Sequence, residues 1–83
     1  MRLYDYTINV KSVLFGPENH MIISAINKKE AMKFCKDFKG IKVLERCKGK
    51  SWRRQFDNID YLMNKQKELL AIELKTKRCF IEN

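Results

Sequence analysis

The chain has 83 residues, of which 45% are hydrophobic and 11% aromatic, and its 18 Lys or Arg against 10 Asp or Glu give a net charge of +8. This length fits one small domain, and the apolar share excludes a disordered chain, so we expect residues 1–83 to form a single compact basic domain. No run approaches the roughly 18 apolar residues of a membrane span, and no signal-peptide core is present. We therefore expect a cytoplasmic protein without membrane contact.

The first part of the chain predicts a β-hairpin. From Leu3 to Val13 apolar and polar residues alternate, which is the period of a half-buried strand. Tyr4, Tyr6, Ile8 and Val10 fall on the core side, and Asp5, Thr7, Asn9 and Lys11 fall on the polar side. The stretch "FGPEN" at 15–19 then favours a turn, and "HMIISAI" at 20–26 favours a second strand.

A helix is predicted over 28–39. Asn27 precedes it as an N-cap, with Glu30 three residues later, and Gly40 follows it as a left-handed C-cap. The predicted core stripe has the i, i+3, i+4, i+7 spacing of one helix face. It consists of Ala31, Phe34, Cys35 and Phe38.

The remaining elements are a third strand, a second helix and a tail. "IKVLERC" at 41–47 is β-branched and favours a strand, and Asp57 and Asp60 suit the start of a helix dipole. We expect this helix to end near Ala71, before an extended or short-strand tail, although a final strand over 71–81 remains an alternative. The predicted fold is a small α+β domain with the order ββαβ, then a second helix and the tail.

The sequence contains no convincing catalytic or metal-binding motif. Its three cysteines, Cys35, Cys47 and Cys79, form no CxxC pair, so we expect free thiols. Arg46 and Lys48 flank Cys47 and would lower its pKa if the thiol faced solvent. The one histidine has no metal-site spacing around it, and no glycine-rich phosphate loop occurs. We expect no enzyme activity, no catalytic residue, no metal, no cofactor and no small-molecule substrate.

Two basic features stand out as candidate binding sites. Three lysines repeat along one face of the first predicted helix, and the segment "ERCKGKSWRRQF" at 45–56 combines cations with a tryptophan. Cations neutralise phosphates, and an aromatic ring offers a surface for a base, although Trp52 could equally close the core. The candidate residues are Lys29, Lys33, Lys36, Arg46, Lys48, Lys50, Trp52, Arg53 and Arg54.

These features favour a non-enzymatic module that binds DNA or RNA through phosphate contacts, largely independently of sequence. The alternative is an inhibitor or adaptor of the phage or mobile-element type. Such a protein would dock its basic surface on a larger acidic protein or nucleoprotein complex. Charge does not separate the two, because a groove built for one polyanion can also be blocked by another protein that carries the matching charge.

Overall fold

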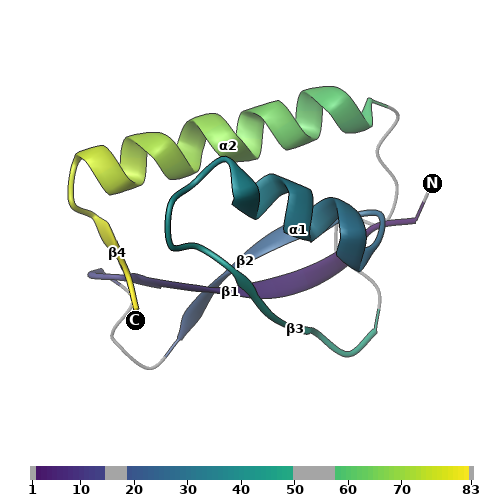
Figure 1. The fold of residues 1–83 in the computed structure, drawn as a ribbon, viewed down its shortest axis with the longest axis horizontal. Coiled ribbons are helices and arrows are strands. Elements are labelled where there is room, and N and C mark those ends of the chain that lie inside the picture. Colours follow the sequence, from purple (N-terminus) through teal and green to yellow (C-terminus); the bar gives the residue numbers. More distant parts are fainter. Residues whose placement is uncertain (1, 15–18, 50–57, 83) are drawn as a thin grey trace.

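The structure is a computed structural model that describes residues 2–14, 19–49 and 58–82. It confirms a small α+β fold with an antiparallel sheet and two helices (Figure 1). The predicted order of elements is matched in part, and the C-terminal tail, expected to be extended or a short strand, adds a strand to the same sheet. In chain order the elements are β1 (Tyr4–Ser12), β2 (His20–Ala25), α1 (Lys28–Lys36), β3 (Val43–Arg46), α2 (Ile59–Lys75) and β4 (Cys79–Ile81).

Strand β1 lies at the centre of the sheet and pairs antiparallel with the three other strands. β2 occupies one side of β1. The other side is shared: β3 pairs with Tyr6–Ile8, and β4 pairs with Val10–Ser12. The two short strands therefore follow one another along the same edge of β1, although one precedes α2 in the sequence and the other follows it.

Asn9 joins β3 and β4 at the point where they meet. Its side-chain Nδ2 donates hydrogen bonds to the carbonyls of Gly40 (2.9 Å) and Glu82 (3.0 Å), and its Oδ1 accepts one from the Lys42 N–H (2.7 Å). Its main chain also bonds to two of these residues: the Asn9 N–H donates to the Lys42 carbonyl, and the Asn9 carbonyl accepts from the Glu82 N–H. Asn9 is 3% exposed, so it is buried although it belongs to the polar residues of the alternation. A buried amide is tolerated here because three backbone groups satisfy it.

Both helices pack on the sheet face that carries Tyr6, Ile8 and Val10, and in Figure 1 both lie above β1. Phe34 of α1 is 1% exposed in this core, and Leu70 of α2 joins the same cluster. Phe38 is partly buried against that cluster, with its ring 5.8 Å from that of Phe34. The predicted inward orientation of α1 is confirmed.

Helix α1 begins as predicted and ends three residues early. Asn27 caps it by accepting a hydrogen bond from the Glu30 N–H at 2.8 Å. The helix stops at Lys36, and tight turns follow in which the Phe38 N–H donates to the Cys35 carbonyl. Gly40 has φ +87°, a left-handed conformation that glycine adopts without the cost of a Cβ. β3 accordingly starts at Val43, two residues later than predicted.

Helix α2 runs four residues further than predicted, to Lys75, so Ile72 and Leu74 are helical and the alternative of a strand over 71–81 is wrong for them. Its N-cap is Asn58, whose side chain accepts from the Tyr61 N–H at 3.0 Å. Sequence reasoning attributed this start to Asp57 and Asp60 instead. Asp60 lies in the first turn, and Asp57 lies outside the described residues. The tail then returns as β4.

Candidate functional site

A groove lies between α1 and the segment that leads into β3. It has a volume of about 370 Å³. Its floor is apolar and its rim carries three lysines, and we call it the basic groove. The lining residues are Lys28, Met32, Cys35, Lys36, Phe38, Ile41, Lys42 and Val43.

Two elements place the rim of the basic groove. Lys28, Met32 and Lys36 lie at i, i+4 and i+8 on α1, which is one stripe along the helix surface. Lys42 approaches from the other wall. Its backbone is held by the buried Asn9 side chain and by the Asn9 N–H, so hydrogen bonds to the central strand fix the position of the Lys42 main chain.

Two further hollows adjoin the basic groove. One, of about 290 Å³, lies on the exposed face of α1 and is lined by Lys28, Lys29, Met32, Lys33 and Lys36. The other, of about 390 Å³, lies at the N-terminus of α1 and is lined by Tyr4, Tyr6, Ile26, Asn27, Lys28 and Arg46. Lys28 belongs to all three, so the hollows form one continuous surface.

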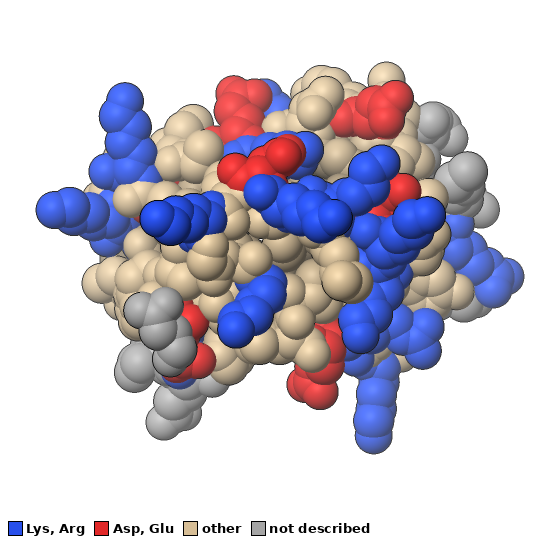
Figure 2. Space-filling model, in the orientation of Figure 1, with Lys and Arg blue, Asp and Glu red and all other residues tan. Residues whose placement is uncertain are grey.

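The charge on this surface is uncompensated within the described part of the chain. No acidic residue lines any of the three hollows, and no ion pair among residues 2–14, 19–49 and 58–82 includes their lysines or Arg46. Figure 2 shows Lys and Arg side chains crowding the face that includes α1, where acidic side chains are fewer. The surface should attract anions.

Arg46 stands at one end of this surface. Its guanidinium carbon lies 5.0 Å from the centre of the Tyr4 ring, a cation–π contact, and its strand register places it opposite Tyr6. Burial raises the pKa of the Tyr6 hydroxyl, although the nearby Arg46 charge opposes the shift. Tyr6 is therefore a neutral phenol at physiological pH, with the Arg46 guanidinium nearby.

The structure brings part of the predicted site together. Lys29, Lys33 and Lys36 share the hollow on the α1 face, and Lys28 links that hollow to Arg46. Lys48 is exposed beyond β3 but lines none of the three hollows. The predictions for Lys50, Trp52, Arg53 and Arg54 fall outside the described residues.

Sequence reasoning did not include Lys28, Met32 and Lys42 in the site. The i, i+4, i+8 spacing of Lys28, Met32 and Lys36 could have indicated the first two. No local pattern indicates Lys42, because its position depends on Asn9, which is 33 residues away in the sequence. Met32 is 49% exposed, an apolar side chain on an otherwise basic helix face.

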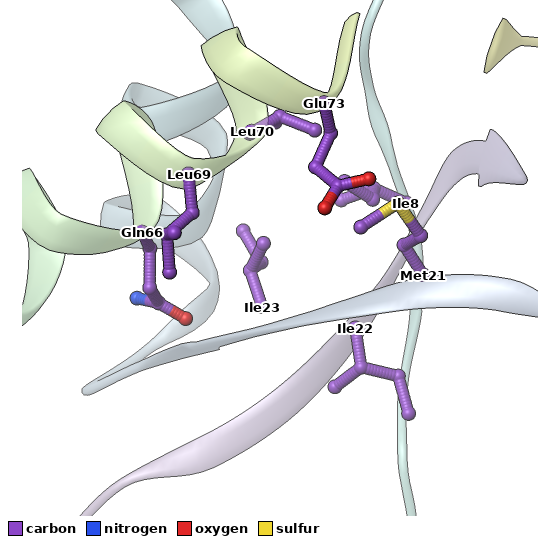
Figure 3. A pocket seen from close by; sticks show the side chains of 8 residues that line it. All are labelled: Ile8, Met21, Ile22, Ile23, Gln66, Leu69, Leu70 and Glu73. Atoms are coloured by element: carbon purple, nitrogen blue, oxygen red, sulfur yellow. The ribbon is translucent and has the colours of Figure 1, made fainter. Parts of the chain in front are cut away.

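A separate hollow, of about 240 Å³, lies between α2 and β2, and we call it the α2 groove. Figure 3 shows side chains of α2 facing Ile23 across it, whereas Ile22 projects from the opposite side of β2. Gln66 closes one end, because its amide accepts from the Ser24 N–H (2.8 Å) and donates to the Ser24 carbonyl (2.9 Å). Its lining is Ile8, Met21, Ile22, Ile23, Gln66, Leu69, Leu70 and Glu73, which includes no cation.

The three cysteines are free thiols. Burial raises the pKa of Cys35 to about 11, and it also raises the pKa of Cys79. The pKa of Cys47 is raised as well, first by burial and then by the carboxylates of Asp5 and Glu45. The conditional alternative, in which Arg46 and Lys48 lower the pKa of a solvent-facing Cys47, is therefore not supported, and the unreactive thiol that we favoured remains. All three thiols are neutral at pH 7 and therefore weak nucleophiles.

The histidine belongs to an ion-pair cluster at the C-terminal strand. Glu82 contacts Lys11 Nζ at 2.6 Å through Oε2 and His20 Nε2 at 3.0 Å through Oε1. The hydrogen bond from Lys11 and the one shared with His20 lower the pKa of Glu82. Across the described ranges, no group of three or more His, Cys, Asp or Glu side chains is arranged to hold a metal ion.

Comparisons with protein-family models, with curated proteins and with solved structures found no match to this chain. Within the part of the chain that the structure describes, neither helix has the length and apolar character needed to cross a bilayer. The inference of function therefore starts from the charge and shape of the surface itself.

Proposed function

We propose that the protein is a non-enzymatic nucleic-acid-binding module that contacts phosphates through the surface formed by α1, β3 and the segment between them. One observation supports this proposal above the others. Among the residues that the structure describes, six cations and no carboxylate line three adjoining hollows. The six are Lys28, Lys29, Lys33, Lys36, Lys42 and Arg46.

The physical basis is the release of counterions. Each phosphate that a lysine or arginine neutralises frees condensed cations from the nucleic acid, which favours binding at low salt. Such contacts position a backbone without identifying bases, so the expected mode is largely independent of sequence. The neutral thiols are weak nucleophiles, and His20 pairs with Glu82, so neither suggests a catalytic role for this surface.

Docking onto an acidic protein or a nucleoprotein complex remains the alternative, and the same six cations would support it. A titration with purified nucleic acid separates the two. A docking protein would show no direct affinity for DNA or RNA, and its partner would be a protein that presents a matching acidic surface.

The experiment compares two charge-matched variants. In the first, Lys29, Lys33 and Lys36 are changed to Ala. In the control, Lys65, Lys75 and Arg78 are changed to Ala, which removes the same charge from the exposed surface of α2 and its C-terminal end. Binding of random-sequence DNA and RNA is measured by fluorescence anisotropy from 50 to 200 mM salt, chosen to span about a fourfold change in ionic strength.

The wild type should bind with an affinity that falls linearly with salt on a log–log plot. The α1 variant should reduce that slope by up to about three units, one for each lost phosphate contact. The control should keep nearly the wild-type slope. Equal effects of the two variants would reduce the proposal to nonspecific attraction by net charge, and no binding by the wild type would refute it.

A further inference from the structure

The floor of the basic groove is more apolar than phosphate binding requires. Met32, Phe38 and Val43 line it together with Ile41 and the neutral thiol of Cys35. A duplex presents phosphates on its outside and keeps its base faces stacked inside, so its binding would leave this floor in contact with water. A single strand offers phosphates and exposed base faces together.

We propose that the basic groove binds single-stranded nucleic acid, with an unpaired base on the Met32 and Phe38 floor and the flanking phosphates at Lys28, Lys36 and Lys42. This inference rests on the proposed function and names its substrate class. A strand bound in this way places the flat face of a base on the apolar floor, and its phosphates pair with the lysines on both walls.

The dimensions and rigidity of the groove suit this occupant. Its volume of about 370 Å³ falls in the roughly 300–1,000 Å³ range of small-ligand pockets. The Phe38 ring is half-buried and braced 5.8 Å from Phe34, so little side-chain freedom remains to be lost when a base contacts it. Lys28 and Lys36 approach from α1, and Lys42 approaches from the opposite wall.

The α2 groove provides an internal reference. It is also apolar, but its lining among the described residues includes Glu73 and no cation. A polyanionic strand would meet a like charge there without compensation. The pairing of an apolar floor with a basic rim therefore distinguishes the basic groove from a merely hydrophobic hollow, whose occupant would be uncharged.

The test uses three 12-nucleotide probes with the same backbone chemistry: oligo-dT, an abasic strand of equal length, and a 12-base-pair duplex. Anisotropy at constant salt measures the affinity of each. The wild type should bind oligo-dT about fivefold or more tightly than the abasic strand, because contact between a base and an aromatic ring adds to the phosphate term. The duplex should bind more weakly than oligo-dT.

Variants of the floor then locate the base. Phe38→Leu keeps an apolar side chain but removes the ring, and Met32→Ala changes an exposed helix position that a folded protein tolerates. Each should lower the affinity for oligo-dT toward that for the abasic strand and leave the abasic affinity unchanged. Leu69→Ala, at a position 57% exposed in the α2 groove, is the matched control and should change neither affinity.

The outcomes separate the two proposals. Equal affinity for oligo-dT and the abasic strand, or tighter binding of the duplex, would overturn the single-strand inference and leave phosphate binding intact. No binding of any probe would overturn both. Binding of laurate at the groove without binding of oligonucleotide would also overturn both, and would assign the groove to an anionic amphiphile.

Discussion

The basic groove lies between α1 and the chain entering β3, and the α2 groove lies between α2 and β2. Both have floors built from the apolar side of the same core, and both are open to solvent. They differ in their rims: three lysines surround the first, whereas Glu73 and the Gln66 amide line the second. The two grooves are thus alike in shape and apolar character, and they differ in charge.

The difference shows that charge decides which hollow can hold a polyanion. The Gln66 amide is also engaged, because it bonds to both backbone groups of Ser24 and so occupies a position on the edge of β2. That contact protects a strand edge, which is a common device against unwanted pairing. The α2 groove is therefore explained by how α2 packs, whereas for the basic groove we propose a bound polyanion.

The largest effect is expected from a change in the core beneath both grooves. Phe34 lies 1% exposed in the core, beside Phe38, and Lys67 of α2 approaches its ring at 6.0 Å. Phe34→Ala should lower the free energy of unfolding by about 3–5 kcal/mol, because a buried ring is replaced by a cavity. Urea denaturation measures this loss, and a change below about 1 kcal/mol would contradict the described core.

A smaller loss of stability, together with weaker oligonucleotide binding, is expected from a change beside the basic groove. Asn9→Ala removes the three hydrogen bonds that its side chain makes to the backbone of Gly40, Lys42 and Glu82. We expect a loss of roughly 2–4 kcal/mol in unfolding free energy, at about 1 kcal/mol for each bond with a further penalty for buried groups left unpaired. Binding of oligo-dT should also weaken, because the Lys42 backbone is then held by the N–H of residue 9 alone. Unchanged stability would mean that Asn9 does not join β3 to β4.

Gln66→Ala is the matching change at the α2 groove. It removes two hydrogen bonds to Ser24 and should cost about 1–2 kcal/mol of unfolding free energy. Oligonucleotide affinity should stay at the wild-type value when both are measured under folded conditions. A loss of affinity comparable to that of the Asn9 variant would remove the distinction between the two grooves.

The smallest effect concerns a site outside both grooves. Lys11 and His20 lower the pKa of Glu82 below its ordinary value, so the folded state favours the carboxylate. The resulting stabilisation is present above the ordinary pKa of a glutamate and is lost as the pH falls through the lowered folded value. The urea midpoint of the wild type should therefore exceed that of Glu82→Gln at pH 7, and the two should converge in acid. A constant difference at all pH values would contradict the ion pairs.

These features differ in how far the sequence predicts them. The cap at Asn27 and the inward stripe through Phe34 depend on spacing over a few residues, and both are found as predicted. Gly40 is left-handed, but the C-cap of α1 is Asp37, so the predicted capping role of Gly40 was wrong. The stripe of lysines on α1 follows from the same helical period. Local signals of this kind are readable because the helix itself creates the proximity.

The remainder depends on contacts between distant segments. Asn9 looked like a solvent-facing strand residue, because alternation does not reveal that two later strands meet beside it. The tail pairs with β1 as β4 because β3 leaves part of that edge of β1 open, and no pattern within 71–81 indicates this partner. Lys42 joins the basic groove for the same reason, since Asn9 sets its place.

The most direct test of the account is to map where a single strand binds. In a titration of ¹⁵N-labelled protein with oligo-dT, followed by NMR, the amide shifts should change along α1 and through Lys42 and Val43. The amides of Leu69, Leu70 and Glu73 in the α2 groove should stay near their free positions. Shifts concentrated in the α2 groove, or no shifts when oligo-dT is in molar excess over the protein, would contradict the assignment of the basic groove as the binding surface.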